Sequence, residues 1–102
     1  MVTVPIGVTD SGERYTKFTD GTLIQCGVKD IPPGQHKTTV RYDIPFVSQP
    51  IFVATPNWVN DSNVSLVTGG NNKDYCDVYI SEDTYGYQKA RQCHWIAIGR
   101  WK

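Results

Sequence analysis

Two sets of side chains alternate with a period of two through the last eleven positions, QCHWIAIGRWK, and apolar residues fill the middle of both sets. One alternate set contains Cys93, Trp95, Ala97, Gly99 and Trp101, and the other contains His94, Ile96, Ile98 and Arg100. This period, with aromatic and β-branched residues, predicts a strand. Because both sets are apolar in the middle, we expect the strand to be covered on both sides. The second cover comes either from a neighbouring subunit or from the second layer of a sandwich built by one chain.

The rest of the chain contains short alternating segments separated by turn residues. Asp20-Gly21 predicts a tight hairpin, and Ile51–Thr55 is apolar on both sides, which predicts a central strand that Pro56 ends or bulges. The first 14 residues are either a lead-in segment or a short edge strand. No helical period is present, so we expect an all-β fold: an antiparallel β-sandwich of six to seven strands. Besides the closing strand, the predicted strands are Tyr15–Phe18, Leu23–Val28, Thr38–Phe46, Ile51–Thr55, Val64–Val67 and Tyr75–Ser81.

Length and charge narrow the class of protein. At 102 residues the chain is one domain, and its ten basic and ten acidic residues argue against a general affinity for nucleic acid or anionic membranes. The N-terminus lacks a basic stretch followed by an apolar one, so we do not expect a signal peptide. Cys26, Cys76 and Cys93 are an odd count, predicted to be small buried side chains in a reducing compartment. A bridge between Cys76 and Cys93 is the alternative.

Residues with catalytic potential do not form a recognisable pattern. His36 lies in a Pro/Gly loop and His94 on the closing strand, and neither has metal-ligand spacing. Glu82 and Asp83 are adjacent, and neighbouring carboxylates on a strand or loop point apart. We therefore expect neither an enzyme nor a cofactor, and no metal ligands.

Binding is better supported, because two predicted loops carry aromatic rings among polar residues. Sugars offer an apolar face to such rings and hydroxyl groups to amides and carboxylates, and the same residue types serve protein-binding surfaces. The alternative for each ring is packing in the core or at the end of the sandwich. The candidate receptor-binding residues are Asn57, Trp58, Asn60 and Asp61 in the first loop and Tyr85 and Tyr87 in the second.

Three segments together resemble the C-terminal domain of phage tail-fibre proteins. They are DGTLIQCG (20–27), YDIPFVSQPIFVATP (42–56) and HWIAIGRW (94–101), and the resemblance covers Tyr15 to Lys102. The departure is Cys26, where the family usually has tryptophan. The resemblance implies a trimeric β-sandwich tip, similar in architecture to H-type lectins, that binds a bacterial surface glycan or outer-membrane protein. It also implies that residues 1–14 lead in from an upstream fibre shaft, and that residues 15–102 form the tip.

The resemblance also gives the two-faced closing strand an interpretation. In a homotrimer one face packs inside the subunit and the other near the threefold axis, with Ile96 and Ile98 on one face and Trp95 and Ala97 on the other. The implied location is the virion, as a fibre tip assembled in the host cytoplasm and acting outside the cell. The alternatives are a stand-alone H-type lectin and a purely structural trimerisation cap. Asp20, Arg41 and His94 match the lectin sugar-site pattern only loosely, so no role is assigned to them.

Overall fold

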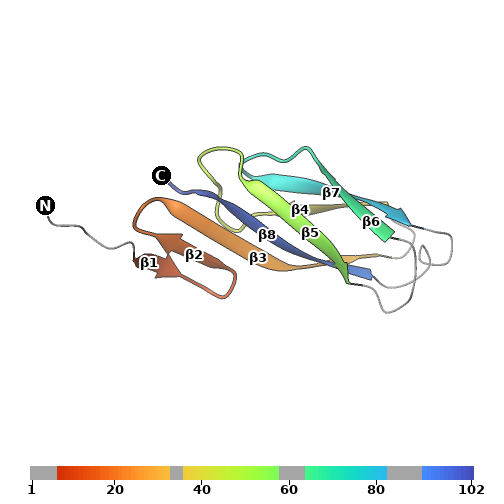
Figure 1. The fold of residues 1–102 in the computed structure, drawn as a ribbon, viewed down its shortest axis with the longest axis horizontal. Coiled ribbons are helices and arrows are strands. Elements are labelled where there is room, and N and C mark those ends of the chain that lie inside the picture. The colour runs from red at the N-terminus through yellow and green to blue at the C-terminus, as the bar shows by residue number, and fades with distance from the viewer. Residues whose placement is uncertain (1–6, 33–35, 58–63, 83–90) are drawn as a thin grey trace, which may run out of the picture.

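The protein is an all-β sandwich of two antiparallel sheets (Figure 1). The computed structural model describes residues 7–32, 36–57, 64–82 and 91–102. The larger sheet has the strand order β1-β2-β3-β8-β5, and the smaller has β4-β7-β6. The predicted fold class is therefore confirmed, with eight strands in place of six or seven. The strands are β1 (Val8–Ser11), β2 (Tyr15–Phe18), β3 (Thr22–Ile31), β4 (Lys37–Arg41), β5 (Ile51–Asn57), β6 (Val64–Gly69), β7 (Tyr75–Glu82) and β8 (Arg91–Arg100).

The closing segment forms strand β8, as predicted, and lies inside the large sheet between β3 and β5. It pairs with β3 from Thr22↔Arg100 to Ile31↔Arg91, and on its other edge with β5. Its two alternate sets of side chains face opposite ways. Cys93 and Ala97 are fully buried against the small sheet and Trp95 is partly buried, whereas Ile96 and Ile98 are exposed. The predicted separation of the two faces is confirmed.

The core lies between the sheets and is rich in aromatic contacts. Tyr42 meets Phe46 edge-on with ring centroids 5.0 Å apart, and Phe52 stacks on Trp95 at 5.9 Å. At Gly99 a Cβ atom would lie 2.6 Å from the Phe46 ring, so only glycine allows the β8 backbone to approach this closely. The main cluster contains Leu23, Val40, Tyr42, Phe46, Phe52, Cys76, Val78 and Ala97.

One buried amide fixes the segment that follows β4. Gln25 is 1% exposed, and its Nε2 donates to the Ile44 carbonyl at 2.7 Å while its Oε1 accepts from the Ile44 N–H at 3.1 Å. The Tyr42 hydroxyl donates to Asn71 Oδ1 at 2.8 Å, and Asn71 Nδ2 donates to the Pro50 carbonyl at 2.7 Å. These hydrogen bonds satisfy buried polar groups that have no partner in the pairing of the strands.

Two strand predictions differ from the structure in position. β5 is an edge of its sheet, not central, so Pro56 stays in register opposite Cys93 without ending or bulging the strand. β4 ends at Arg41 instead of Phe46. The alternation of buried residues nevertheless continues to Phe46, because the chain after β4 still lies along the core.

The first residues and the cysteines also refine the sequence-based picture. Val8–Ser11 forms the short edge strand that was one of two alternatives, pairing with β2. All three cysteines are free, so the alternative bridge between Cys76 and Cys93 is absent. Cys76 and Cys93 are buried as predicted, but Cys26 is exposed, because its position in β3 faces away from the small sheet.

Candidate functional surfaces

The outward side of the large sheet carries rows of apolar side chains across β3, β8 and β5. Ile98 lies opposite Ile24 on one side and Ile51 on the other. Next along the strands, Ile96 lies opposite Cys26 and Val53. The exposed fractions are 37% for Ile96, 41% for Ile98, 56% for Val53 and 73% for Ile51. We call this surface, made by Ile24, Cys26, Val28, Ile51, Val53, Ile96 and Ile98, the outer apolar face.

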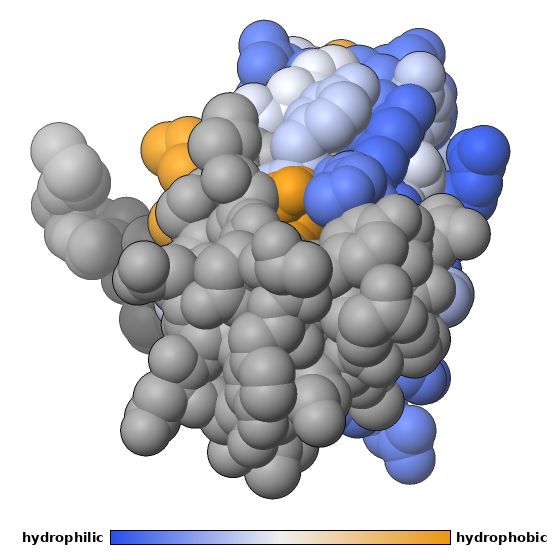
Figure 2. Space-filling view, turned by 90° about the vertical axis from the view of Figure 1, so that its right-hand side faces the viewer, coloured by the Kyte–Doolittle hydropathy of each residue, from blue (hydrophilic) through white to orange (hydrophobic). Residues whose placement is uncertain are grey.

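A third row borders this face and introduces polar groups. His94 lies between Val28 and Thr55. A shallow hollow of about 320 Å³ is lined by Val53, Thr55, His94, Trp95 and Ile96. Figure 2, seen along the molecule from one end, shows hydrophobic residues at the upper left and near the centre, and hydrophilic residues over most of the upper right.

Isolated exposed apolar residues are normal, but a contiguous group of this size commonly marks a contact surface. Edge and central strands that face water usually alternate apolar with polar residues, and here β3, β5 and β8 carry apolar residues at matching positions. The arrangement leaves the part of this side formed by β3, β8 and β5 suited to burial against another protein surface.

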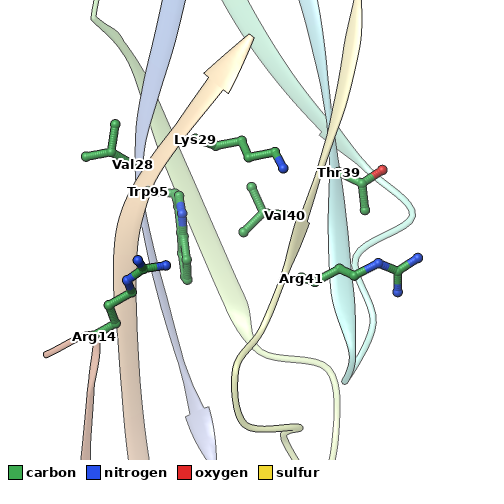
Figure 3. Close-up of a pocket in the computed structure, with 7 residues that line it drawn as sticks. All are labelled: Arg14, Val28, Lys29, Thr39, Val40, Arg41 and Trp95. Carbon is green, nitrogen blue, oxygen red and sulfur yellow. The ribbon is translucent and has the colours of Figure 1, made fainter. Parts of the chain in front are cut away.

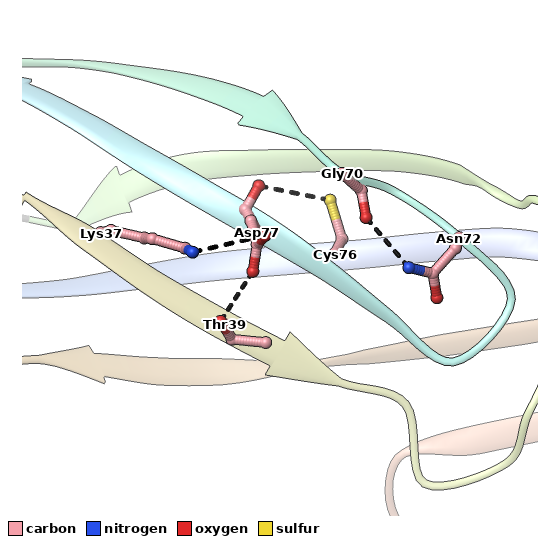
Figure 4. A network of polar contacts seen from close by, with 6 residues as sticks. All are labelled: Lys37, Thr39, Gly70, Asn72, Cys76 and Asp77. Carbon is pink, nitrogen blue, oxygen red and sulfur yellow. Dashed lines mark hydrogen bonds and ion pairs between the residues drawn. The ribbon is translucent and has the colours of Figure 1, made fainter.

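The opposite side of the sandwich, the outward side of the small sheet, is polar and aromatic. Asp77 accepts a hydrogen bond from the Thr39 hydroxyl at 2.7 Å and pairs with Lys37 at 3.6 Å (Figure 4). Lys37 also lies 5.6 Å from the centre of the Tyr79 ring, and Arg41 lies 5.4 Å from the centre of the Tyr75 ring. We call this surface the polar face.

A cleft opens between the sheets where β3 passes β4. It has a volume of about 420 Å³ and is lined by Arg14, Val28, Lys29, Thr39, Val40, Arg41 and Trp95. Figure 3 shows the Lys29 chain extending across the space toward β4, with Arg14 and Trp95 on the β3 side. The cleft is therefore bordered by cations and an indole ring.

The structure separates the predicted site residues into two groups. Ile96 and Ile98 lie together on the outer apolar face. The backbone of Asn57 ends β5 opposite Gln92, and the other loop candidates lie outside the described residues. These other candidates are Trp58, Asn60, Asp61, Tyr85 and Tyr87.

The three residues that match the lectin pattern loosely do not form one site. The Asp20 carboxylate accepts from the Thr22 N–H at 2.9 Å, and this bond lowers the pKa of Asp20, so the residue serves the hairpin turn. Arg41 lies over the Tyr75 ring on the polar face. His94 is exposed on the opposite side of the molecule, beside the outer apolar face.

Sequence reasoning missed Val28, Ile51 and Val53 as members of the exposed surface. Their signal was present, because each occupies an alternate position aligned with Ile96 and Ile98 once the register is known. Within the described ranges no group of three or more His, Cys, Asp or Glu residues could hold a metal ion. No helix in that part of the chain is long and apolar enough to cross a membrane.

The domain is a two-sheet antiparallel β-sandwich whose large sheet leaves apolar side chains exposed on β3, β8 and β5. The chain belongs to the gp53-like tail fiber protein C-terminal family, whose model matches residues 17–100. It is therefore a tail-fibre C-terminal domain, as the sequence resemblance indicated. No curated protein sequence matches the chain.

Solved structures of pyocin fibers share the fold. A C-terminal fragment of the P. aeruginosa R1 pyocin fiber superposes with a TM-score of 0.70 at 23% identity, over 94% of this chain and 28% of the fragment. An N-truncated R1-type pyocin tail fiber gives the same score and identity, over 94% of this chain and 86% of the other. The P. aeruginosa R2 pyocin fiber fragment gives 0.64 at 18% identity, over 95% and 26%. This chain thus spans about a quarter of the two longer fragments.

Proposed function

We propose that this domain is the distal, receptor-binding tip of a phage or phage-like tail fibre, and that it works as a homotrimer without catalysis. Its ligand would be a bacterial surface glycan or an outer-membrane protein. The upstream part of the fibre would connect through residues 1–14. Three copies on one tip would turn weak single-site binding into strong adsorption through avidity.

The outer apolar face is the observation that carries this proposal. Ile51 is 73% exposed and Ile98 41% exposed in a single chain, and they are cross-strand neighbours in the same row. Burial of such side chains favours association by about 25 cal/mol for each Å² of apolar area removed from water. We propose that two further copies of the chain cover the outer apolar face. Fibre C-terminal domains share this fold, and in a closed ring every equivalent face is covered.

Trimerisation through this face would leave the polar face directed outward. The polar face presents Tyr79, 45% exposed, with Lys37 and Asp77 beside it. Together with the loop residues Asn57, Trp58, Asn60, Asp61, Tyr85 and Tyr87, it would offer rings and hydrogen-bonding groups to a receptor. The subunit contacts and the receptor contacts would thus use different sides of one sandwich.

Adsorption to cells tests the proposal. The fluorescently labelled domain should bind a subset of a panel of bacterial strains that differ in surface glycan. Periodate treatment of the cells should abolish binding if the receptor is a glycan, and protease treatment should do so if it is a protein. Trp58→Ala should weaken adsorption and leave the oligomeric mass unchanged. A domain that forms trimers but adsorbs to no strain would instead be a structural cap.

A further inference from the structure

We propose that the cleft between β3 and β4 binds an oxyanion, a phosphate or carboxylate group carried by a saccharide. The inference deepens the proposed function, because it takes this saccharide to be part of the cell-surface receptor. It assigns the ligand contacts to Arg14, Lys29 and Trp95, none of which belongs to the predicted loops.

The cleft carries positive charge that no ion pair among the described residues neutralises. Arg14 and Lys29 are exposed, both line the cleft, and neither forms an ion pair with another residue of the described ranges. No carboxylate from those ranges lines the space. By contrast, the other two polar groups there are engaged on the polar face, since the Thr39 hydroxyl bonds Asp77 and Arg41 covers the Tyr75 ring. Figure 3 shows the side chains of Thr39 and Arg41 directed away from Trp95.

The Trp95 ring, which lines the cleft, carries a further hydrogen-bond donor. A Cβ atom at Gly27 would lie 3.0 Å from the indole nitrogen, so the glycine lets the ring pack closely against the β3 backbone. The indole N–H, a donor with no accepting ability, bonds to no acceptor in the part of the chain that the structure describes. A buried or half-buried indole N–H normally has a partner, which here a ligand oxygen would supply.

These groups define the ligand by their chemistry. A guanidinium, an ammonium and an indole N–H are all donors, so they suit a group that only accepts hydrogen bonds and carries negative charge. The side chain of Val40 adds apolar lining. A volume of about 420 Å³ is in the range of small-ligand pockets and has room for one charged sugar.

Nuclear magnetic resonance of the full chain tests the site, with the assigned Trp95 indole N–H as the probe. Glucose 6-phosphate and glucuronic acid serve as the phosphate and carboxylate arms, and glucose as the neutral arm. We expect a saturable shift of the Trp95 signal with at least one charged sugar and none with glucose. Arg14→Gln and Lys29→Gln should each weaken binding about tenfold, the usual scale for one charge-assisted hydrogen bond.

Lys73→Gln is the matched control, because it removes one exposed cation outside the cleft. Gly27→Ala should also weaken binding, since its methyl group would crowd the indole N–H. Equal shifts with glucose, no saturable shift, or equal affinity for Arg14→Gln and Lys73→Gln would each overturn the inference. Adsorption to cells separates the two proposals: adsorption without oxyanion binding refutes the cleft alone, and oxyanion binding without adsorption refutes the receptor function alone.

Discussion

Replacing Ile98 by aspartate should convert the proposed trimer into folded monomers. Ile98 lies in the middle of the outer apolar face, on the central strand β8, between Ile24 and Ile51. Its side chain points away from the small sheet and is 41% exposed in a single chain. The substitution therefore places a carboxylate where three subunits are proposed to meet, without entering the core of any one of them.

The magnitudes for folding and for assembly differ widely. Full burial of an isoleucine contributes about 1.5 to 3 kcal/mol, so losing the part covered within one chain costs about 1 to 2 kcal/mol. A domain of ordinary stability tolerates that loss. Burying a carboxylate at a subunit contact costs several kcal/mol for each copy, or on the order of 10 kcal/mol for three. At 1.4 kcal/mol for each factor of ten, the trimer association constant should fall by roughly seven orders of magnitude.

Light scattering after size-exclusion chromatography measures the outcome directly. The unmodified chain should elute at three times its 11.5 kDa mass, and Ile98→Asp at the mass of one chain with an unchanged circular dichroism spectrum. Alkylation of Cys26, which lies on the same face, gives a second signal. It should be slow in the trimer, where the thiol is covered, and fast in the variant.

Tyr79→Asp is the control, since Tyr79 is 45% exposed on the opposite face, beside Lys37. It introduces the same charge and should leave the trimer intact. The reasoning fails if the unmodified chain is a monomer at every concentration, or if Ile98→Asp and Tyr79→Asp have the same mass.

Three further predictions concern the stability of the single chain. Gly99→Ala should lower the free energy of unfolding by about 1 to 3 kcal/mol in urea denaturation, because the new Cβ meets a core ring; Gly7→Ala, with open space around it, should have little effect. Gln25→Met should cost about 2 to 4 kcal/mol in the same assay, because it leaves the N–H and carbonyl of Ile44 unpaired, and an unchanged midpoint would contradict this. Burial raises the pKa of Cys76 from 9.0 to about 11. The free energy of unfolding should therefore fall by about 2 to 3 kcal/mol between pH 9 and pH 11, because the unfolded chain loses the thiol proton first. The fall should be smaller in Cys76→Ala.

The alternation in the closing strand predicted much of the fold. A period of two fixes which side chains share a face, so the separation of Ile96 and Ile98 from Trp95 and Ala97 followed from the sequence alone. The place of a strand within its sheet did not follow. Ile51–Thr55 is apolar on both sides and was predicted to be central, yet the strand that contains it, β5, is an edge strand. An apolar run indicates cover on both faces, but it does not distinguish cover from the same chain and cover from another one.

The surfaces were harder to predict because they depend on strand register. Val28, Ile51 and Val53 come from different segments and become neighbours of β8 residues only through cross-strand pairing. The same holds for the cleft, which brings together Arg14 from the turn before β2, Lys29 from β3 and Trp95 from β8. Motif spacing along the chain contains no information on such pairs, whereas it does predict local turns such as Asp20-Gly21.

The exposed face of β5 links the edge position of that strand to assembly. An uncovered edge strand with a row of apolar side chains is a hazard for aggregation, and natural proteins usually protect it with charges, a proline or a covering element. Here Pro56 lies in the strand and removes one N–H group, but Ile51 and Val53 remain exposed on the sheet face. Proline limits the pairing of additional strands along the edge and has no effect on packing against the face. The combination therefore favours contact through side chains, as in a closed trimer, over the open-ended strand pairing that leads to aggregates.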